Sequence, residues 1–274
     1  MGMSLQVCVL GSGSTGNATV VASKSHAVLV DAGFSAKEIA QRMEEAGWSP
    51  DRLDAMLVSH EHGDHVVGLP VMYRRHKLPL YANIGTMEAV SANEKYQGLD
   101  WRIFSNGQPF AVGDLVIEPF SVPHDAYDPV GFRIQCGNCA VVVLTDIGVA
   151  TNLVRQRLKD SDALVIECNH DVRMVNDAER PWYLKQRILG RQGHLSNEAC
   201  ADLLTEVASP RLKQIFLTHL SEDCNTPELA LQTIERRLAA EGHPDIAVEM
   251  TWPDRVSARW CASKGLLPCT EPTS

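Results

Sequence analysis

The sequence predicts a layered α/β protein in which helices cover β-sheets. From about residue 140 to residue 240, short apolar runs alternate with amphipathic segments, as in proteins whose helices pack on a sheet. Between about residues 80 and 134, short alternating segments are separated by Gly, Asn and Pro, which predicts antiparallel hairpins around Gly107 and Gly113. The 274 residues are 45% hydrophobic, enough for one domain. We expect a single domain over 1–274, with its core at about 5–240 and a peripheral tail at about 253–274.

The first third reads as short strands followed by a helix. Ser35 is a good N-cap, Glu38 three residues later completes a reciprocal capping pattern, and Gly47 ends the apolar periodicity. A later helix is expected from about Val66 to Arg75. The strands expected before it are Gln6–Leu10, Thr19–Val21, Val28–Val30 and Ala55–Val58.

The second half alternates regularly between strands and helices. The expected strands are Ala140–Leu144, Ala163–Ile166 and Gln214–Leu217. The expected helices lie near Val149–Leu158, Asn197–Val207 and Pro227–Ala240.

Composition narrows the class of protein. The net charge of −9 argues against a broad electropositive surface for gripping nucleic acid. No apolar run is long enough to span a bilayer and no leader opens the chain, so we expect a cytoplasmic protein with no membrane partner. The eight cysteines are scattered, which predicts reduced packing residues. Cys136 and Cys139 have zinc-like spacing, but Gly137 and Asn138 between them favour a hairpin turn.

The segment from His60 to His65 is the strongest functional signal. It places three imidazoles and the carboxylate of Asp64 within six residues, directly after an apolar strand. Imidazole and carboxylate are the usual ligands of divalent transition metals. A polar loop with chance histidines is the alternative, and the density of ligands disfavours it.

Several apolar runs end on a residue that can bind metal or protons. Because the carboxyl ends of neighbouring strands form one rim in a layered sheet protein, these residues are expected to converge. They are Asp31, His60, His124, Asp146, Glu167 and His219. Taken alone, Asp31 could be a turn residue and His124 a loop imidazole.

The order of these residues resembles the metallo-β-lactamase superfamily, whose signature is His-x-His-x-Asp-His followed by a separate His, an Asp and a C-terminal His. The resemblance covers about residues 5–240 and implies a four-layer αββα sandwich with a two-metal site. It implies that Asp146 bridges the metals and that Asp31 orients ligands by hydrogen bonding. By the same resemblance, the first metal binds His60, His62 and His124, and the second binds Asp64, His65 and His219.

Finer motifs resemble the YycJ/WalJ group, reported as DNA exonucleases and related to tRNase Z. The quoted segments are Gly11 to Asn17, Pro123 to Ala126, Glu167 to Asp171, Gly193 to Asn197 and His219 to Asn225. The resemblance implies that His194 donates a proton. No long arm of the tRNase Z kind and no added β-CASP domain are found in the sequence, which weakens a tRNA-processing role.

We therefore expect a dinuclear phosphodiester hydrolase, most specifically a nuclease, whose nucleophile is a metal-bridging hydroxide. Asp64 belongs to the catalytic metal centre, His194 protonates the leaving oxygen, and Glu167 orients His194. Zinc is the first expectation for the two divalent ions, with manganese or iron(II) as alternatives. The expected partner is nucleic acid or another phosphodiester, and oligomeric state is left open.

The sequence indicates substrate-binding residues less specifically than metal ligands. The Gly/Ser loop with Ser12, Ser14 and Asn17 could cradle a phosphate through backbone N–H groups, or form a plain tight turn. His170 is either a substrate contact or a surface histidine. The basic stretch from Arg173 to Arg191 is a solvated helix face or a substrate contact.

Three other functions are compatible with the same metal ligands. A thioester or lactone hydrolase of the glyoxalase II type is one alternative, although a thiolate leaving group hardly needs a proton donor such as His194. A small cyclic phosphodiester could replace a polymer as substrate. A metal-bearing regulatory protein without turnover is the third alternative, and the complete ligand set disfavours it.

Overall fold

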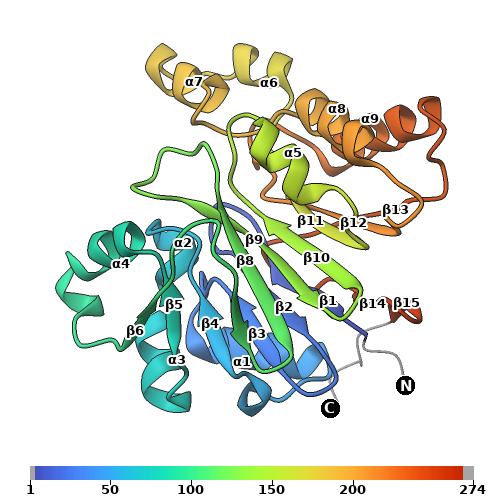
Figure 1. Ribbon diagram of the computed structural model, residues 1–274. Helices are drawn as coiled ribbons and strands as arrows, with labels where there is room; N and C mark the ends of the chain where they lie inside the picture. The colour runs from blue at the N-terminus through green and yellow to red at the C-terminus, as the bar shows by residue number, and fades with distance from the viewer. Residues whose placement is uncertain (1–3, 268–274) are drawn as a thin grey trace.

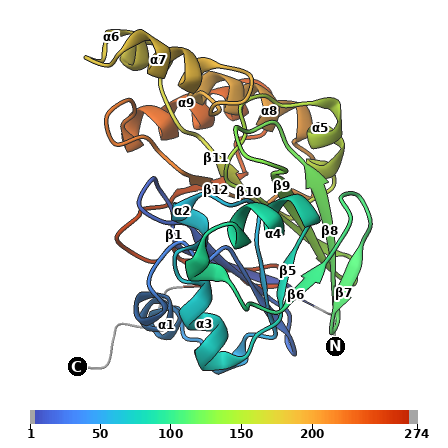
Figure 2. The ribbon, with the colours of Figure 1, turned by 90° about the vertical axis from the view of Figure 1, so that its left-hand side faces the viewer.

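Two mixed β-sheets pack face to face, and helices cover both outer faces (Figures 1 and 2). The structure, a computed structural model, describes residues 4–267. Apolar clusters fill the space between the two sheets and the space between each sheet and its helices. This arrangement is the predicted four-layer αββα sandwich, so the predicted fold class is confirmed.

The first sheet has the strand order β15-β14-β1-β2-β3-β4-β5-β6. Neighbours from β15 to β3 are antiparallel, and those from β3 to β6 are parallel. Its strands are β1 (Gln6–Gly11), β2 (Ala18–Ala22), β3 (Ala27–Val30), β4 (Ala55–Leu57), β5 (Leu80–Ala82), β6 (Trp101–Ile103), β14 (Arg259–Cys261) and β15 (Gly265–Leu267).

The second sheet has the order β13-β12-β11-β10-β9-β8-β7. Neighbours from β7 to β10 are antiparallel, and those from β10 to β13 are parallel. Its strands are β7 (Phe110–Val112), β8 (Leu115–Ser121), β9 (Val130–Cys136), β10 (Cys139–Leu144), β11 (Ala163–Glu167), β12 (Gln214–Thr218) and β13 (Ala247–Met250).

Helices cover the outer faces in two groups. Over the first sheet and its connections lie α1 (Ala36–Glu45), η1 (Pro50–Arg52), α2 (Gly63–Val66), α3 (Leu69–His76), α4 (Ile84–Ser91) and η2 (Glu94–Tyr96). On the side of the second sheet lie α5 (Asn152–Leu158), α6 (Val172–Asp177), α7 (Trp182–Leu189), α8 (Asn197–Val207) and α9 (Pro227–Ala240).

Central strands are apolar on both faces because both faces are covered. In β10, Val141 and Val143 join the cluster between the sheets, whereas Val142 and Leu144 join the cluster beneath the helices. Successive side chains of a strand point to opposite faces, so such a strand must be apolar throughout. This explains why the strand was visible as a continuous apolar run.

The middle of the chain differs from the expected row of hairpins. The hairpin around Gly113 is present as β7 and β8, but Gly107 lies in the connection between the two sheets. Helix α4 was missed, and β5 pairs with β6 in parallel. Asn83 accepts a hydrogen bond from the Thr86 N–H and caps α4, a signal that could have revealed the helix.

Helical boundaries depart locally from the sequence pattern. The single helix expected from Val66 is divided into α2 and α3 at Gly68, where a Cβ atom would lie 2.2 Å from the Phe34 carbonyl oxygen. The Ser35 hydroxyl caps α1 as predicted by accepting the Glu38 N–H. The Glu38 carboxylate pairs with Arg42, so the reciprocal half of the capping pattern is not formed.

The C-terminal segment is less peripheral than expected. Residues 259–261 extend the first sheet as β14, and Trp260 is 3% exposed in the cluster between the sheets. The part of the predicted tail at residues 268–274 lies outside the described residues, as do residues 1–3. None of the helices within residues 4–267 has the length and apolar character needed to cross a membrane.

The cysteines behave as packing residues within the described chain. Seven of them are buried and form no disulfide, and Cys269 lies outside the described residues. Cys136 and Cys139 face each other across the β9–β10 hairpin, and Gly137 has a φ of 58° at its turn. The predicted turn is therefore present.

Candidate metal centre

The expected site residues converge on one edge of the two sheets. The parallel strands β3 and β4 carry Asp31 and the loop beginning at His60 beyond their carboxyl ends. In the second sheet, β10, β11 and β12 are parallel and end at or just before Asp146, Glu167 and His219. His124 follows β8, which runs in the same direction as β10.

Three imidazoles form the first group. The Nδ1 atom of His62 lies 3.1 Å from Nε2 of His60 and 3.3 Å from Nε2 of His124. On the other side of its ring, Nδ1 of His60 is 2.9 Å from the Ser59 hydroxyl, and Nδ1 of His124 is 3.1 Å from the Gly193 carbonyl oxygen. With Nδ1–H donating to these oxygens, Nε2 of both rings is left as a metal ligand.

The second group centres on the fully buried His65. Its Nδ1–H donates to Asp31 Oδ2 at 2.8 Å, which turns Nε2 toward Asp146 Oδ2 at 3.0 Å and Asp64 Oδ2 at 3.3 Å. Asp31 also accepts the N–H and O–H of Ser59 at 2.8 and 2.7 Å. The structure thus places Asp31 behind the ligand, where it orients His65.

Glu167 joins two imidazoles in a third group. Its Oε1 atom lies 2.6 Å from His194 Nδ1 and 2.9 Å from His219 Nδ1, while Oε2 accepts the N–H groups of Ile147 and Leu195 at 3.0 Å. The His219 Nδ1 atom is also 3.2 Å from Asp146 Oδ1. Potential ligand atoms of Asp146, Glu167, His194 and His219 all lie within 4.8 Å of one another.

Two residues at the site have a strained backbone. Asp31 has a φ of 60° and His219 a φ of 54°. Both values lie in the left-handed region, which residues other than glycine seldom adopt. The N–H of His219 donates to Ser12 at 3.0 Å, which holds this conformation. Strain concentrated on two buried polar residues is typical of a functional site.

The chemistry of the cluster fits divalent cations. Asp146 Oδ2 is buried and accepts no well-oriented hydrogen bond among the described residues, although His65 Nε2 lies 3.0 Å away and a buried carboxylate oxygen normally secures one. Three lone-pair nitrogens of the first group also face one another at 3.1–3.3 Å. A cation at each position would satisfy these acceptors, so the residues present fit a metal centre.

Burial and the neighbouring charges set the pKa values of the imidazoles in the cluster. Burial, reinforced by the charge of His65, lowers the pKa of His60 well below its usual value, which keeps it neutral. Burial would also lower the pKa of His219, but Asp146, Asp64 and Glu167 outweigh it and raise that pKa to about 10. Protonated imidazoles thereby neutralise the buried carboxylates, a charge that bound cations would supply instead.

The candidate substrate-binding residues do not all lie at the cavity. Ser14 lines a cavity of about 260 Å³ next to the metal centre, together with Thr15, Asn169, Arg180, Ile188, His194, His219, Ser221, Glu222 and Asp223. Ser12 is buried and donates to Asn17, while the buried Asn17 amide contacts Asp64 Oδ2 and His65 Nε2 at 3.1 Å. Ser12 and Asn17 are therefore placed to support the candidate ligands, and their role in holding substrate stays a prediction.

His170 is not the surface histidine that was one of its two expected roles. It is 1% exposed, and its Nδ1 atom lies 3.3 Å from the Asn169 side chain. Burial lowers its pKa to about 4, so this imidazole is neutral and packed inside. Such burial does not fit a surface histidine, and a contact with substrate stays a prediction.

One residue at the site was not singled out from the sequence. Ser59 connects Asp31 to His60, and its position directly before the first ligand was the available signal. Arg180 belongs to the basic stretch that the sequence offered as a helix face or a substrate contact, and it lines the cavity from the segment before α7.

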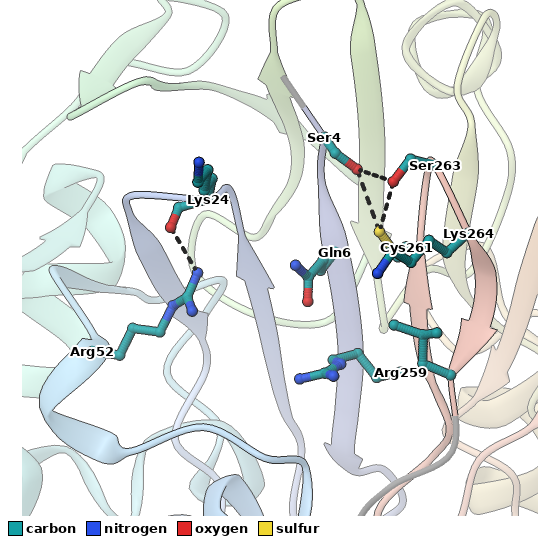
Figure 3. Close-up of a pocket in the computed structure, with 9 residues that line it drawn as sticks. Ser4, Gln6, Lys24, Arg52, Arg259, Cys261, Ser263 and Lys264 are labelled. Carbon is teal, nitrogen blue, oxygen red and sulfur yellow. Dashed lines mark hydrogen bonds between the residues drawn. The ribbon is translucent and has the colours of Figure 1, made fainter. Parts of the chain in front are cut away.

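A second cavity, of about 310 Å³, lies at the other end of the first sheet, beside β1 and β14 (Figure 3). Its described lining contains Lys24, Arg52, Arg259 and Lys264 but no histidine or carboxylate. Apart from the thiol of Cys261, this lining holds no metal-ligating side chain, whereas imidazoles and carboxylates gather in the centre around His60.

Comparison with known proteins agrees with this geometry. Residues 26–220 match the family described as β-lactamase superfamily domain. Exodeoxyribonuclease WalJ of Streptococcus pneumoniae is 39% identical over 235 residues, which cover 84% of this chain and 87% of that protein. Exodeoxyribonuclease YycJ of Bacillus anthracis is 36% identical over 247 residues, covering 88% and 91%.

Among solved structures, the metallo-β-lactamase fold protein YhfI of Bacillus subtilis is similar with a TM-score of 0.70. The match covers 92% of this chain and 99% of that one at 18% identity. At this identity the likeness bears on the fold alone.

Proposed function

Because this chain belongs to the β-lactamase superfamily, we propose that its metal centre hydrolyses phosphodiester bonds of DNA from a chain end. The names of the relatives WalJ and YycJ support DNA as the substrate and an exonucleolytic mode. The observation that carries the proposal is the His194–Glu167 pair beside the cluster of metal ligands. We expect the protein to act in the cytoplasm.

The ligands would divide as the family resemblance implies. His60, His62 and His124, which form one cluster, would hold one divalent cation. Asp64, which lies 3.3 Å from His65 and 3.7 Å from His219, would hold a second together with these two residues, and Asp146 would serve both. Zinc is our first expectation, and the same ligands suit manganese or iron(II). The cations would supply Lewis acidity and an activated water at neutral pH.

His194 would provide the proton for the leaving oxygen. Its Nδ1–H donates to Glu167 at 2.6 Å, so Nε2 is the ring nitrogen left for the substrate, and the residue lines the adjacent cavity. Burial alone would lower the pKa of His194, but Glu167 outweighs it and raises that pKa. A charged donor suits an alkoxide leaving group, whereas a thiolate has little need of one, and this favours the diester over a thioester.

A side-by-side assay tests the proposal. Metal-loaded protein is given bis(p-nitrophenyl) phosphate, a glutathione thioester, and end-labelled single- and double-stranded DNA and RNA. We expect hydrolysis of the diester and release of mononucleotides from DNA. Hydrolysis of the thioester alone would contradict the proposal, and internal cuts in a circular DNA would contradict the exonucleolytic mode.

Ligand variants test the site itself. Asp64→Ala and His65→Ala are expected to lose bound metal and nearly all activity, measured by elemental analysis and by diester turnover. His243→Ala, which replaces a histidine outside the ligand clusters, is the matched control and should retain both.

A further inference from the structure

Helix α7 exposes two large aromatic side chains beside the candidate active site. Trp182 is 64% exposed and Tyr183 is 67% exposed, and no residue of this eight-residue helix is buried. Adjacent aromatic rings left in water are unusual in a folded protein and typically mark a binding surface. Packing within the chain therefore does not explain these two residues.

The helix is directly connected to the proton donor. The N–H of His194 donates to the Ile188 carbonyl oxygen at 3.0 Å, and Ile188 lines the cavity that His194 and His219 share. A Cβ atom on Gly193 would lie 2.2 Å from the Arg187 carbonyl oxygen, so the loop that carries His194 packs closely on the end of α7. The end of α7 thus lies next to the reacting groups, and Trp182 lies about 9 Å further along the helix from Ile188, within reach of a ligand that runs along α7.

The segment that contains α7 carries a net positive charge, although the protein as a whole is acidic. Residues 172–191 contain five basic and two acidic side chains, a net charge of +3, whereas the whole chain carries −9. Arg187 pairs with Asp125, next to the candidate ligand His124, which fixes α7 against the β8–β9 connection. Arg173 and Arg191 are exposed and form no ion pair among residues 4–267, so both can meet phosphate groups. Figures 1 and 2 both place α6 and α7 at one end of the molecule, open to solvent.

We propose that the exposed side of α7 binds a single-stranded segment of the nucleic acid, with bases stacked on Trp182 and Tyr183 and phosphates facing the basic side chains. This inference rests on the proposed function and names the form of the substrate. Stacking on a protein ring requires an unpaired base, because bases within a duplex already stack on each other. Aromatic and basic side chains together are the usual components of a single-strand surface.

The first test separates strand binding from chemistry. In Trp182→Ala/Tyr183→Ala, kcat/KM for a single-stranded DNA is expected to fall by about ten-fold or more relative to kcat/KM for bis(p-nitrophenyl) phosphate, with the loss mainly in KM. Trp182→Phe/Tyr183→Phe keeps the ring faces and should restore most of this ratio. Ile103→Ala removes an exposed apolar residue of β6 and is the matched control, expected to leave the ratio unchanged. An unchanged ratio in the double alanine variant would overturn the inference.

The second test measures binding without cleavage. Fluorescence anisotropy of a labelled oligothymidylate is followed with the His194→Ala protein, with and without the two aromatic changes. We expect weaker binding when the rings are removed, and weaker competition by a blunt duplex than by a single strand. Equal competition by both forms would contradict the single-strand assignment. If the wild-type protein cleaved no diester at all, the proposed function would fail while this binding result could still be read.

Discussion

Glu167 holds two imidazoles in position through hydrogen bonds. One carboxylate oxygen contacts both His194 and His219, and the other accepts two backbone N–H groups. The carboxylate is fully buried and paired, so its position is fixed before substrate arrives. Glu167 is therefore placed to position His194, the proposed proton donor.

His194→Ala should separate catalysis from metal binding. We expect the variant to keep its metal and to lose about 10²–10⁴-fold in turnover, the usual contribution of a positioned general acid. Metal content by elemental analysis and kcat on a diester are measured on the same sample. Loss of metal would show that His194 is a ligand, as its place in the four-residue cluster with Asp146 allows.

Glu249 gives a prediction for pH-dependent stability. Burial raises its pKa, although the Ala258 N–H donates to its carboxylate at 2.8 Å. A raised carboxyl pKa means that the folded state holds its proton more tightly. Stability from this group is therefore full below the unfolded pKa and declines as pH rises through the folded pKa.

Glu249→Gln should remove that decline. Comparison of urea denaturation at acidic and neutral pH is expected to show a smaller loss of stability in the variant than in the wild type. Glu228→Gln, at the exposed start of α9, is the control. An identical pH dependence in wild type and Glu249→Gln would refute the assignment.

At the scale of elements, close packing fixes the ligand loop. Gly33 follows β3, and a Cβ atom there would lie 1.7 Å from the Asp64 carbonyl oxygen and 2.4 Å from the Asn17 nitrogen. The backbone N–H of Asn17 donates to that same carbonyl at 2.8 Å. Three segments distant in sequence thus meet without room for a side chain.

Gly33→Ala is expected to destabilise the protein by about 3 kcal/mol and to reduce metal affinity, because the backbone of Asp64 must move. Gly63→Ala, in the ligand loop that Gly33 contacts, is the matched control, since nothing lies within 4 Å of its added Cβ atom. Its stability should remain within about 1 kcal/mol of wild type. Chemical denaturation and metal titration measure both effects. Equal behaviour of the two variants would argue against close packing at Gly33.

At the scale of the whole molecule, the metal centre connects the two sheets. His60 and His65 follow a strand of the first sheet, whereas Asp146 and His219 follow strands of the second. Bound cations would therefore cross-link the two sheets at one edge.

Removing metal with a chelator is expected to lower Tm, because a ligand that binds only the folded state stabilises it. Calorimetry with and without the chelator measures the shift. Asp64→Ala, which should bind little metal, is expected to show a much smaller shift. Equal Tm values for the wild type with and without metal would contradict this cross-linking.

Trp260 tests the contribution of the C-terminal segment. Its side chain is 3% exposed between the sheets, so Trp260→Ala should cost about 3–5 kcal/mol in the free energy of unfolding. Leu266, on the adjacent β15, is 44% exposed, and Leu266→Ala should change stability by less than about 0.5 kcal/mol. Urea denaturation compares the two. A small effect at Trp260 would return this segment to the peripheral role that its composition predicted.

The sequence by itself was sufficient for the layered fold, most strands of the core and the set of candidate ligands. Strands covered on both faces must be apolar, and a metal site needs imidazoles and carboxylates, so both leave a local pattern at Val142 or His60. Only the tertiary structure showed that Asn17 and Ser12 are placed to support the candidate ligands, that His170 is buried, and that β14 joins the first sheet. These facts depend on contacts between distant segments, for which the chain carries no local signal. The same reason explains why α7 was visible as a basic stretch, while its place beside His194 was not.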